Sequence, residues 1–311
     1  MGPVSVDSIV TSRWIRTAVF AKDWKGKQVQ LHPVSTGITN KNYRVEVDGK
    51  WYFLRIPGKA TDLLSVNRAH EHYNTVAASN AAVSPKVLYY LEPESIMVLE
   101  YVTGEIMSIR SLQTIEAINK IVHSLKMLHS GPRFANEFNM FRLREFYLDV
   151  ARKHDVRIPD DYYDYSWVAD RIEKAMVAQP THLVPCHNDL LAENFIDDGK
   201  FMWIIDYEYS GNNDCCFELG NVCIEMEYTR TQVELLCKEY FGAVLRNKIA
   251  RMSLYSIMSD VGWTLWGSIQ NKVSDLDFDF WSYTMNRWNR AKKNIDSSEF
   301  SGWLNGVTEE T

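Results

Sequence analysis

The stretch PCHNDLLAENFIDDGKFMWIIDYE, which begins at Pro185, constrains this chain of 311 residues more than any other feature. Its first half holds a His-x-Asp triplet whose aspartate, Asp189, precedes Asn194 by five positions. Its second half is an apolar run, FMWII, that ends directly at Asp206 and Glu208. The Asp-Gly pair between the halves favours a tight hairpin turn, because such turns need positive φ. The pattern therefore predicts a polar loop followed by a β-hairpin that delivers two carboxylates at its end.

These polar residues form the set that phosphoryl transfer requires. One carboxylate meets the acceptor hydroxyl, while an amide oxygen and a second carboxylate hold the magnesium that bridges the nucleotide phosphates. Mg²⁺ takes hard oxygen ligands and keeps several waters, so few protein ligands suffice. Taken alone, either motif would also fit a strand that ends in a solvated turn. The spacing of the two motifs together is what indicates a site. We predict Asp189 and His187 as catalytic residues and Asn194, Asp206 and Glu208 as metal ligands.

The segments CHNDLLAENFI and WIIDYEYSGNND resemble the catalytic and metal-binding segments of the aminoglycoside phosphotransferase and choline kinase superfamily. The pair IDYEYS and ELGNVCIE resembles its choline/ethanolamine kinase branch, in particular the bacterial choline kinases. This resemblance implies ATP and Mg²⁺ as cofactors. It also implies an α+β, protein-kinase-like fold of two lobes. Residues 1–101 would form a small lobe with a five-stranded antiparallel sheet, and residues 102–311 a larger, mostly helical lobe.

Short alternating runs predict the strands of the first lobe. The apolar spacing predicts helices over Asp7–Phe20 and Asp62–Ser79. A tight turn at Asp48-Gly49 joins two of the strands. The five predicted strands cover Gln28–Val34, Asn42–Val47, Trp51–Ile56, Val87–Leu91 and Ile96–Tyr101.

Beyond Gly104 the apolar residues recur at helical spacing. Because a frayed end is expected where this spacing stops, we predict no regular structure from Ser297 onwards. The predicted helices cover Leu112–Ser130, Phe141–His154, Tyr162–Ala178, Phe217–Met226, Thr231–Phe241, Asn247–Gln270 and Phe278–Asn294.

The loop after the first strand is a candidate phosphate-binding loop. The superfamily usually has G-G-x-T-N there, and Gly37, Thr39 and Asn40 match that pattern, whereas Thr36 replaces its first glycine. Small residues let backbone amides approach phosphates closely, although a flexible hairpin loop would look the same. The resemblance further implies that the backbone of the linker between the lobes receives the adenine, and we expect Leu99, Glu100, Tyr101 and Val102 to make that contact.

Arg55 lies near the end of the third predicted strand. Protein kinases carry a phosphate-binding lysine at this position, and choline kinases resemble this chain in having an arginine there. Its fork of donors can hold a phosphate oxygen and a carboxylate together, and Glu71 is the expected partner. The alternative for Glu71 is a salt bridge within its own helix, for example with Arg68. We assign Arg55 to both the catalytic and the nucleotide-binding residues.

The acceptor must be identified from the C-terminal helices. Trp263 and Trp266 are three residues apart and share one helical face, and Tyr283 follows on the next helix. In the choline kinases that this chain resembles, matching aromatic residues and a glutamate, here Glu225, enclose the quaternary ammonium next to the catalytic Asp189. Plain core packing is the alternative for two tryptophans at this spacing. In the same family an aspartate usually stands where Glu218 does, and we expect Glu218 to support the catalytic loop.

Composition narrows the possible partners and compartment. With 40 acidic against 34 basic residues, the net charge is −6, which argues against nucleic acid as a partner. No apolar run has the length of a membrane span, so we expect no membrane insertion. Five cysteines without a C-x2-C pair fit a reducing cytoplasm and argue against a zinc site. The oligomeric state stays open.

The sequence thus predicts a cytoplasmic, Mg²⁺- and ATP-dependent kinase that phosphorylates choline. Ethanolamine or another amino alcohol could use the same acidic pocket. An aminoglycoside would need a wide acidic cleft, to which Asp275, Asp277 and Asp279 could contribute. A non-catalytic nucleotide-binding module is the alternative from another class.

Overall fold

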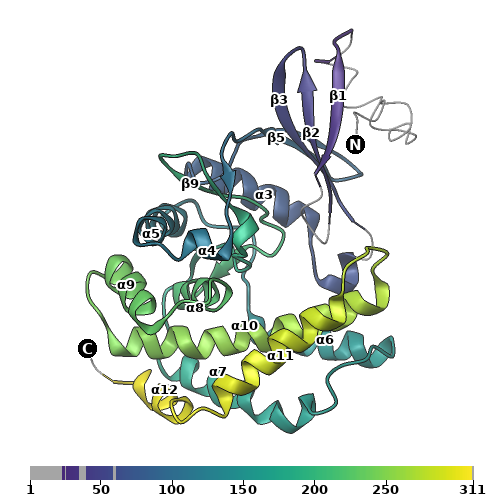
Figure 1. Ribbon diagram of the computed structural model, residues 1–311. Helices are drawn as coiled ribbons and strands as arrows, with labels where there is room; N and C mark the ends of the chain where they lie inside the picture. The colour runs from purple at the N-terminus through teal and green to yellow at the C-terminus, as the bar shows by residue number, and fades with distance from the viewer. Residues whose placement is uncertain (1–22, 25, 35–39, 59–60, 310–311) are drawn as a thin grey trace.

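The computed structural model describes residues 23–24, 26–34, 40–58 and 61–309. The helix predicted over Asp7–Phe20 and the loop residues Gly37 and Thr39 lie outside these ranges. A small β-sheet stands above a larger helical part, as Figure 1 shows. This arrangement confirms the predicted α+β fold with an antiparallel sheet first and helices after it. The exact division at residues 101 and 102 stays a prediction.

The sheet has five antiparallel strands in the order β1-β2-β3-β5-β4. Its inward-facing side chains, among them Leu31, Val45, Leu54 and Val98, form a small core of their own. Asp48 and Gly49 both have positive φ, 49° and 79°, as the predicted tight turn requires. The strands are close to those predicted: β1 Val29–Val34, β2 Lys41–Val47, β3 Lys50–Ile56, β4 Val87–Leu91 and β5 Ile96–Glu100.

The helix predicted over Asp62–Ser79 is confirmed from Arg68 onwards, but its predicted start is wrong, because the chain breaks there. A 3₁₀ turn, η1 (Thr61–Leu64), is followed by Ser65 at a positive φ of 59°. Asn67 then caps a new helix, α3 (Arg68–Asn80), since its side-chain oxygen accepts hydrogen bonds from two backbone amides at 3.0 Å. The break makes Arg68 the first residue of α3, one turn before Glu71.

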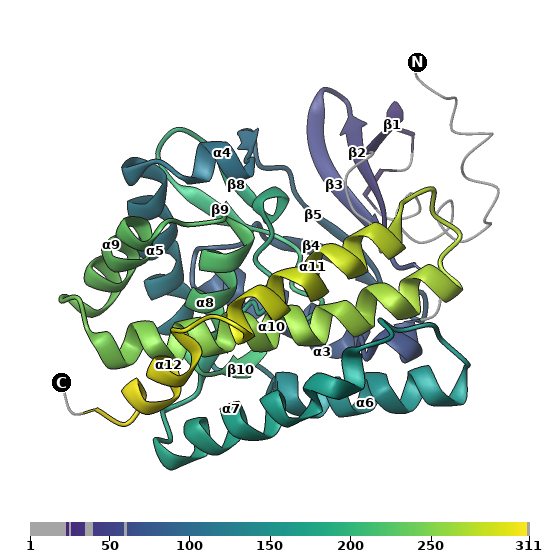
Figure 2. The same cartoon turned by 60° about the horizontal axis from the view of Figure 1, so that its bottom comes forward.

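The helical part is organised around α10 (Arg246–Val273), whose middle is buried along its whole circumference. Figures 1 and 2 show α11 running alongside α10, with α6 and α7 along the lower edge. The predicted helices are confirmed to within a few residues, except that the span predicted from Tyr162 begins with a 3₁₀ turn (Tyr162–Tyr165) and that the tail is helical instead of frayed. A short helix that was not predicted, α4, precedes the first of them. The remaining helices are α4 Ile109–Leu112, α5 Ile115–His129, α6 Met140–Lys153, α7 Ser166–Ala178, α8 Cys215–Glu225, α9 Arg230–Phe241, α11 Phe280–Ile295 and α12 Phe300–Gly306.

The tail is ordered because it has apolar side chains to bury. Phe300 and Val307 are each about 5% exposed or less and belong to the main hydrophobic core. Burying a side chain of this size stabilises a fold by about 1.5–3 kcal/mol, which is enough to hold a short helix against the domain. Helical periodicity alone could not detect this, since α12 spans only Phe300–Gly306.

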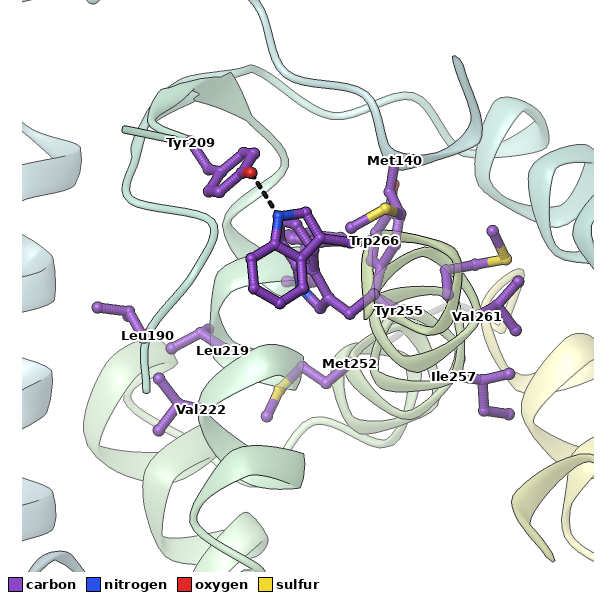
Figure 3. Close-up of a cluster of buried hydrophobic side chains, with 14 of the residues drawn as sticks. Met140, Leu190, Tyr209, Leu219, Val222, Met252, Tyr255, Ile257, Val261 and Trp266 are labelled. Carbon is purple, nitrogen blue, oxygen red and sulfur yellow. Dashed lines mark hydrogen bonds between the residues drawn. The ribbon is translucent and has the colours of Figure 1, made fainter. Parts of the chain in front are cut away.

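The main hydrophobic core extends from the helices to the residues of the predicted site. Figure 3 shows Trp266 of α10 among buried side chains from α8 and the preceding loops, including Leu219, Val222 and Tyr209. Close packing of α8 on α10 depends on Gly220, where a Cβ atom would come within 2.3 Å of the Met252 carbonyl oxygen. Any larger residue there would push apart the two helices that border the site.

Short strands frame the predicted catalytic stretch. The predicted hairpin is β8 (Phe195–Asp197) paired with β9 (Met202–Ile204), and Gly199 in its turn has a φ of 91°. β6 (Glu105–Ile106) pairs with β8, while β7 (Val184–Cys186) pairs with β10 (Gly211–Asn213). Among the described residues, no helix combines the length and the apolar character that a membrane span needs.

Candidate active site

Two cavities meet at the catalytic stretch. The larger, of about 400 Å³, lies between the sheet and the helical part, and the smaller, of about 50 Å³, lies against α10 and α11. Glu193, Asn194 and Asp206 line both cavities. The predicted metal ligands Asn194 and Asp206 therefore stand in the wall through which a group could pass from one cavity to the other.

The carboxylate of Glu218 holds the backbone of the predicted catalytic loop at His187 and Asn188. One of its oxygens accepts a hydrogen bond from the His187 amide at 3.0 Å, and the other accepts one from the Asn188 amide at 2.7 Å. Asn188 has a positive φ of 69°, and its side chain donates to three backbone carbonyls of neighbouring segments. These contacts fit the expectation that Glu218 supports the loop.

His187 lies beneath the cavities and lines neither of them. Its Nδ1 accepts a hydrogen bond from the Asp189 amide at 3.3 Å, so the proton is on Nε2, which donates to the Ile205 carbonyl at 2.8 Å. Burial lowers the pKa of the imidazole, which keeps it neutral. Since the His187 side chain lines neither cavity, this geometry favours a role in orienting the loop. The catalytic role predicted for His187 stays a prediction.

Asp189 lines the smaller cavity, as expected for a residue that meets the acceptor. Its carbonyl oxygen accepts a hydrogen bond from the Asn194 side chain at 2.8 Å, which couples the two residues. Burial raises the pKa of its carboxyl group well above the usual range, and the guanidinium of Arg287 opposes that rise. A raised pKa makes the carboxylate a better proton acceptor than an exposed one.

The three predicted metal ligands differ in how free their oxygens are. The Asn194 amide nitrogen donates to Asp189, which leaves its Oδ1 for a cation. Asp206, at a φ of 73°, has a side chain that is 26% exposed, and its Oδ1 accepts from Arg55 at 2.5 Å. Within the described residues no hydrogen bond to its Oδ2 is found. Two open oxygens of this kind suit Mg²⁺.

Glu208 is more enclosed. Its side chain is only 5% exposed, and its Oε2 accepts three hydrogen bonds at 3.0–3.2 Å, from Asn40, Arg55 and Arg68. The structure thus places the third predicted ligand beside the other two but surrounds it with positive charge. Asn40, predicted to contact phosphate, is the first donor of this group and also accepts from Arg68 and the Gly58 amide.

Arg55 and Glu71 are brought together as expected, at 3.1 Å. The alternative contact is present as well, because Arg68 lies 2.6 Å from the second oxygen of Glu71. Neighbouring carboxylates raise the pKa of Arg55 despite its burial, so the guanidinium is charged. Arg55 lines the larger cavity, whereas Arg68 does not.

The linker residues also lie where they were expected. Leu99, Glu100, Tyr101 and Val102 all line the larger cavity, opposite the hairpin of the catalytic stretch. The Glu100 amide is already bonded to the Lys86 carbonyl at 2.9 Å, so the free linker backbone begins at the next residue.

Aromatic rings wall the smaller cavity. Trp263 and Trp266 are perpendicular, with ring centroids 6.4 Å apart, and Tyr283 lies 5.5 Å from Trp266. Tyr209, which the sequence analysis did not identify, completes the wall: its hydroxyl accepts a hydrogen bond from the Trp266 indole at 2.7 Å (Figure 3). Its position directly after Glu208 was the available signal, because it continues the segment that carries the predicted ligands.

Glu225 is not brought to this cavity. It does not line the cavity, and its carboxylate is bound by Arg287, through both oxygens, and by Arg290 at 2.9 Å. Burial would raise its pKa, but the two arginines hold it below the usual range. These contacts give no support to the predicted direct contact of Glu225 with a substrate cation, which stays a prediction. Its charge is already neutralised by arginines of α11.

The chain is similar to known proteins in both sequence and structure. Residues 31–241 match the model of the choline/ethanolamine kinase family. The crystal structure of a choline/ethanolamine kinase family protein from Mesorhizobium loti is 34% identical, covers 94% of this chain and 96% of its own, and superimposes with a TM-score of 0.80. The choline kinase LicA from Streptococcus pneumoniae is 27% identical over 85% and 94% of the two chains, with a TM-score of 0.71. Ethanolamine kinase 2 of Mus musculus is 26% identical over 87% of this chain and 77% of its own.

Proposed function

Because the chain belongs to the choline/ethanolamine kinase family, we propose that it transfers the γ-phosphate of ATP to the hydroxyl of choline, giving phosphocholine. The observation that carries this choice of acceptor is the smaller cavity, where Asp189 shares a wall with Trp263, Trp266 and Tyr283. A quaternary ammonium donates no hydrogen bonds, so aromatic faces are the natural means to bind it. Its hydroxyl would then lie toward Asp189.

ATP would occupy the larger cavity, with the adenine at the linker and the phosphates toward Arg55. Asn194 and Asp206 would hold a Mg²⁺ ion, which in such sites bridges phosphate oxygens and neutralises their charge. Their place in both walls is what supports this assignment. The fit is a matter of donor chemistry: an amide oxygen and a partly exposed carboxylate are hard oxygen ligands.

Asp189 would orient the acceptor hydroxyl toward the γ-phosphate and take its proton late in the reaction. Phosphoryl transfer has a loose transition state, so catalysis is mostly positioning and charge stabilisation. Burial of the carboxylate and its bond to Asn194 through the backbone favour a fixed orientation. Because the hydroxyl is a weak acid, early removal of its proton would be costly, and a late transfer avoids that cost.

The rival acceptors differ in size and hydrogen bonding. Ethanolamine would fit the same cavity, but its ammonium group would seek acceptors instead of rings. An aminoglycoside would need far more room than about 50 Å³, since sites for ligands of drug size measure about 300–1,000 Å³. Asp275, Asp277 and Asp279 line neither cavity, so they offer no support for that reading. We also propose a cytoplasmic location, which suits five free cysteines.

The test is ATP turnover with choline, ethanolamine, thiamine, homoserine and kanamycin, in wild type and in Trp263→Ala and Trp266→Ala. Each desolvated cation–π contact is worth about 0.5–2 kcal/mol, so either variant should raise KM for choline by roughly 2- to 30-fold. ATP affinity should hardly change, and ethanolamine turnover should suffer less. Equal losses with both amines and a lower Tm would mean that the tryptophans only fill the core. Preference for another acceptor in wild type would refute the assignment to choline.

A further inference from the structure

Arg68 is an arginine beside the candidate metal site for which the proposed reaction provides no role. It is the first residue of α3 because Asn67 caps the helix there. Its guanidinium contacts three groups: Glu71 at 2.6 Å, Glu208 at 3.2 Å and the Asn40 amide oxygen at 3.1 Å. Its side chain is 11% exposed and lines neither of the two cavities. It therefore acts on the site through other side chains.

The contact with Glu208 determines what that carboxylate can do. Oε2 of Glu208 already accepts from Asn40, Arg55 and Arg68. A carboxylate oxygen has two lone pairs, so these three donors, two of them guanidinium groups, compete with a metal ion for Oε2 of Glu208. Asp206, by contrast, has one oxygen in contact with Arg55 and a much more exposed side chain.

The net charge of the cluster around Arg68 also indicates that this arginine limits metal binding. Arg55 and Arg68 face three carboxylates, those of Glu71, Asp206 and Glu208. This cluster carries one net negative charge, and removal of Arg68 would leave two. A cation that binds at Asp206 would then meet a stronger negative field and a second carboxylate with one guanidinium fewer competing for it.

We propose that Arg68 is a positioning residue that occupies Glu208 and so leaves Asn194 and Asp206 as the ligands of the catalytic metal. The arginine holds Glu208, Glu71 and the start of β2 in one arrangement, at the expense of metal affinity. This inference rests on the proposed Mg²⁺-dependent kinase activity. It makes an unusual prediction: loss of Arg68 should tighten metal binding while it slows the reaction.

The experiment measures equilibrium binding of ADP to the full chain while the Mg²⁺ concentration is varied. Arg68→Met should lower the Mg²⁺ concentration for half-maximal binding by about tenfold, as expected for one charge removed within a few ångströms. Asp206→Asn should raise it by at least that factor, since it removes a ligand. Arg68→Lys should restore the wild-type Mg²⁺ dependence, because the charge returns, but not the full kcat, because an ammonium lacks the planar fork.

Arg152→Met is the matched control. Arg152 also pairs with an acidic residue three positions away, Asp149, but it lies on the exposed face of α6, with its side chain 77% exposed, and it lines neither of the two cavities. It should leave Mg²⁺ dependence and kcat unchanged. A double variant, Arg68→Met with Glu208→Gln, should return the Mg²⁺ dependence to within about threefold of wild type, because the freed charge is removed with it.

Two results would overturn the proposal. One is a higher Mg²⁺ requirement, or an unchanged one, in Arg68→Met. The other is a loss in Glu208→Gln as large as that in Asp206→Asn, which would make Glu208 a direct ligand; this variant also serves as the test should Arg68→Met fail to fold. Because ADP binding needs no acceptor, an error in the choice of choline would leave this measurement intact.

Discussion

Two buried networks of charged side chains flank the reaction site, and they differ in what they leave open. The network of Arg55, Arg68, Glu71, Asp206 and Glu208 has an excess of negative charge and exposes Asp206 to both cavities. The network of Glu225, Asp260, Arg287 and Arg290 is balanced, and its acids are at most 8% exposed. The first network thus keeps one acid in excess of its arginines, whereas the second keeps none. We therefore expect the first to bind ligands and the second to stabilise the fold.

Asp189 lies between the two networks, and the largest effect is expected there. Within the described residues its carboxylate has no ion pair, so it is the acid left free for the acceptor. Asp189→Asn should lower kcat by about 10²- to 10⁴-fold, the usual contribution of a proton-accepting group. Binding of ATP with Mg²⁺ should stay within a few-fold, and the Tm should not fall. Steady-state kinetics and equilibrium binding check this, and near-normal turnover would remove Asp189 from the mechanism.

Glu225→Gln tests the balanced network, with the next largest effect. Removing one partner leaves Arg287 buried and undercompensated, which should lower the free energy of unfolding by about 3–5 kcal/mol. The ratio of kcat/KM for choline to that for ethanolamine should stay close to wild type, because Glu225 does not line the cavity.

Glu227→Gln is the control for that variant, since Glu227 lies two residues further on and is exposed. Denaturant unfolding and kinetics with both amines make the comparison. A selective rise in KM for choline without any loss of stability would contradict the structure and restore Glu225 as a substrate contact.

The smallest effect concerns Glu218 and pH. Burial alone would raise its pKa, but hydrogen bonds from His129 and from the Asn188 amide bring the pKa below the usual value of 4.5. The ionised form is thus favoured in the folded state. Its stabilising effect is present above the unfolded pKa and is lost as the pH falls through the lower folded pKa.

Glu218→Gln should therefore destabilise the protein by about 1–3 kcal/mol near pH 7, the loss expected when buried amides lose an acceptor. The difference in Tm between wild type and variant should shrink as the pH falls toward 4, where wild type begins to protonate. Thermal melts at several pH values test this sign. A difference that grows on acidification would mean that the carboxylate is not ionised in the folded state.

The two networks also mark the limit of what the sequence could predict. Asp206 and Glu225 each follow an apolar run, and each was expected to meet a cation. What separates them is the partner supplied by distant elements: Arg287 comes from α11, more than sixty residues after Glu225. Local patterns describe hairpins and helices well, since a turn such as Asp48-Gly49 depends on its own residues. Charge pairing across the fold leaves no local pattern, which is why Arg287 was missed and why the contact of Arg68 with Glu208 was not expected.

The resemblance did predict what local patterns could not, including the contact of Arg55 with Glu71. Even so, the two partners expected for Glu71 were treated as alternatives. The structure shows Glu71 in both of the alternatives considered, with Arg55 on one oxygen and Arg68 on the other. The break that starts α3 at Arg68 makes this possible, and it depends on Ser65 and Asn67 instead of on the apolar spacing.

The wall that the two cavities share has a thermodynamic consequence. Glu193, Asn194 and Asp206 face both spaces, so a ligand on one side changes the surface met by a ligand on the other. Any factor by which a nucleotide alters the Kd of the amino alcohol must appear, unchanged, in the effect of the amino alcohol on the nucleotide. Because the same three side chains line both cavities, we expect each substrate to act as an effector of the other.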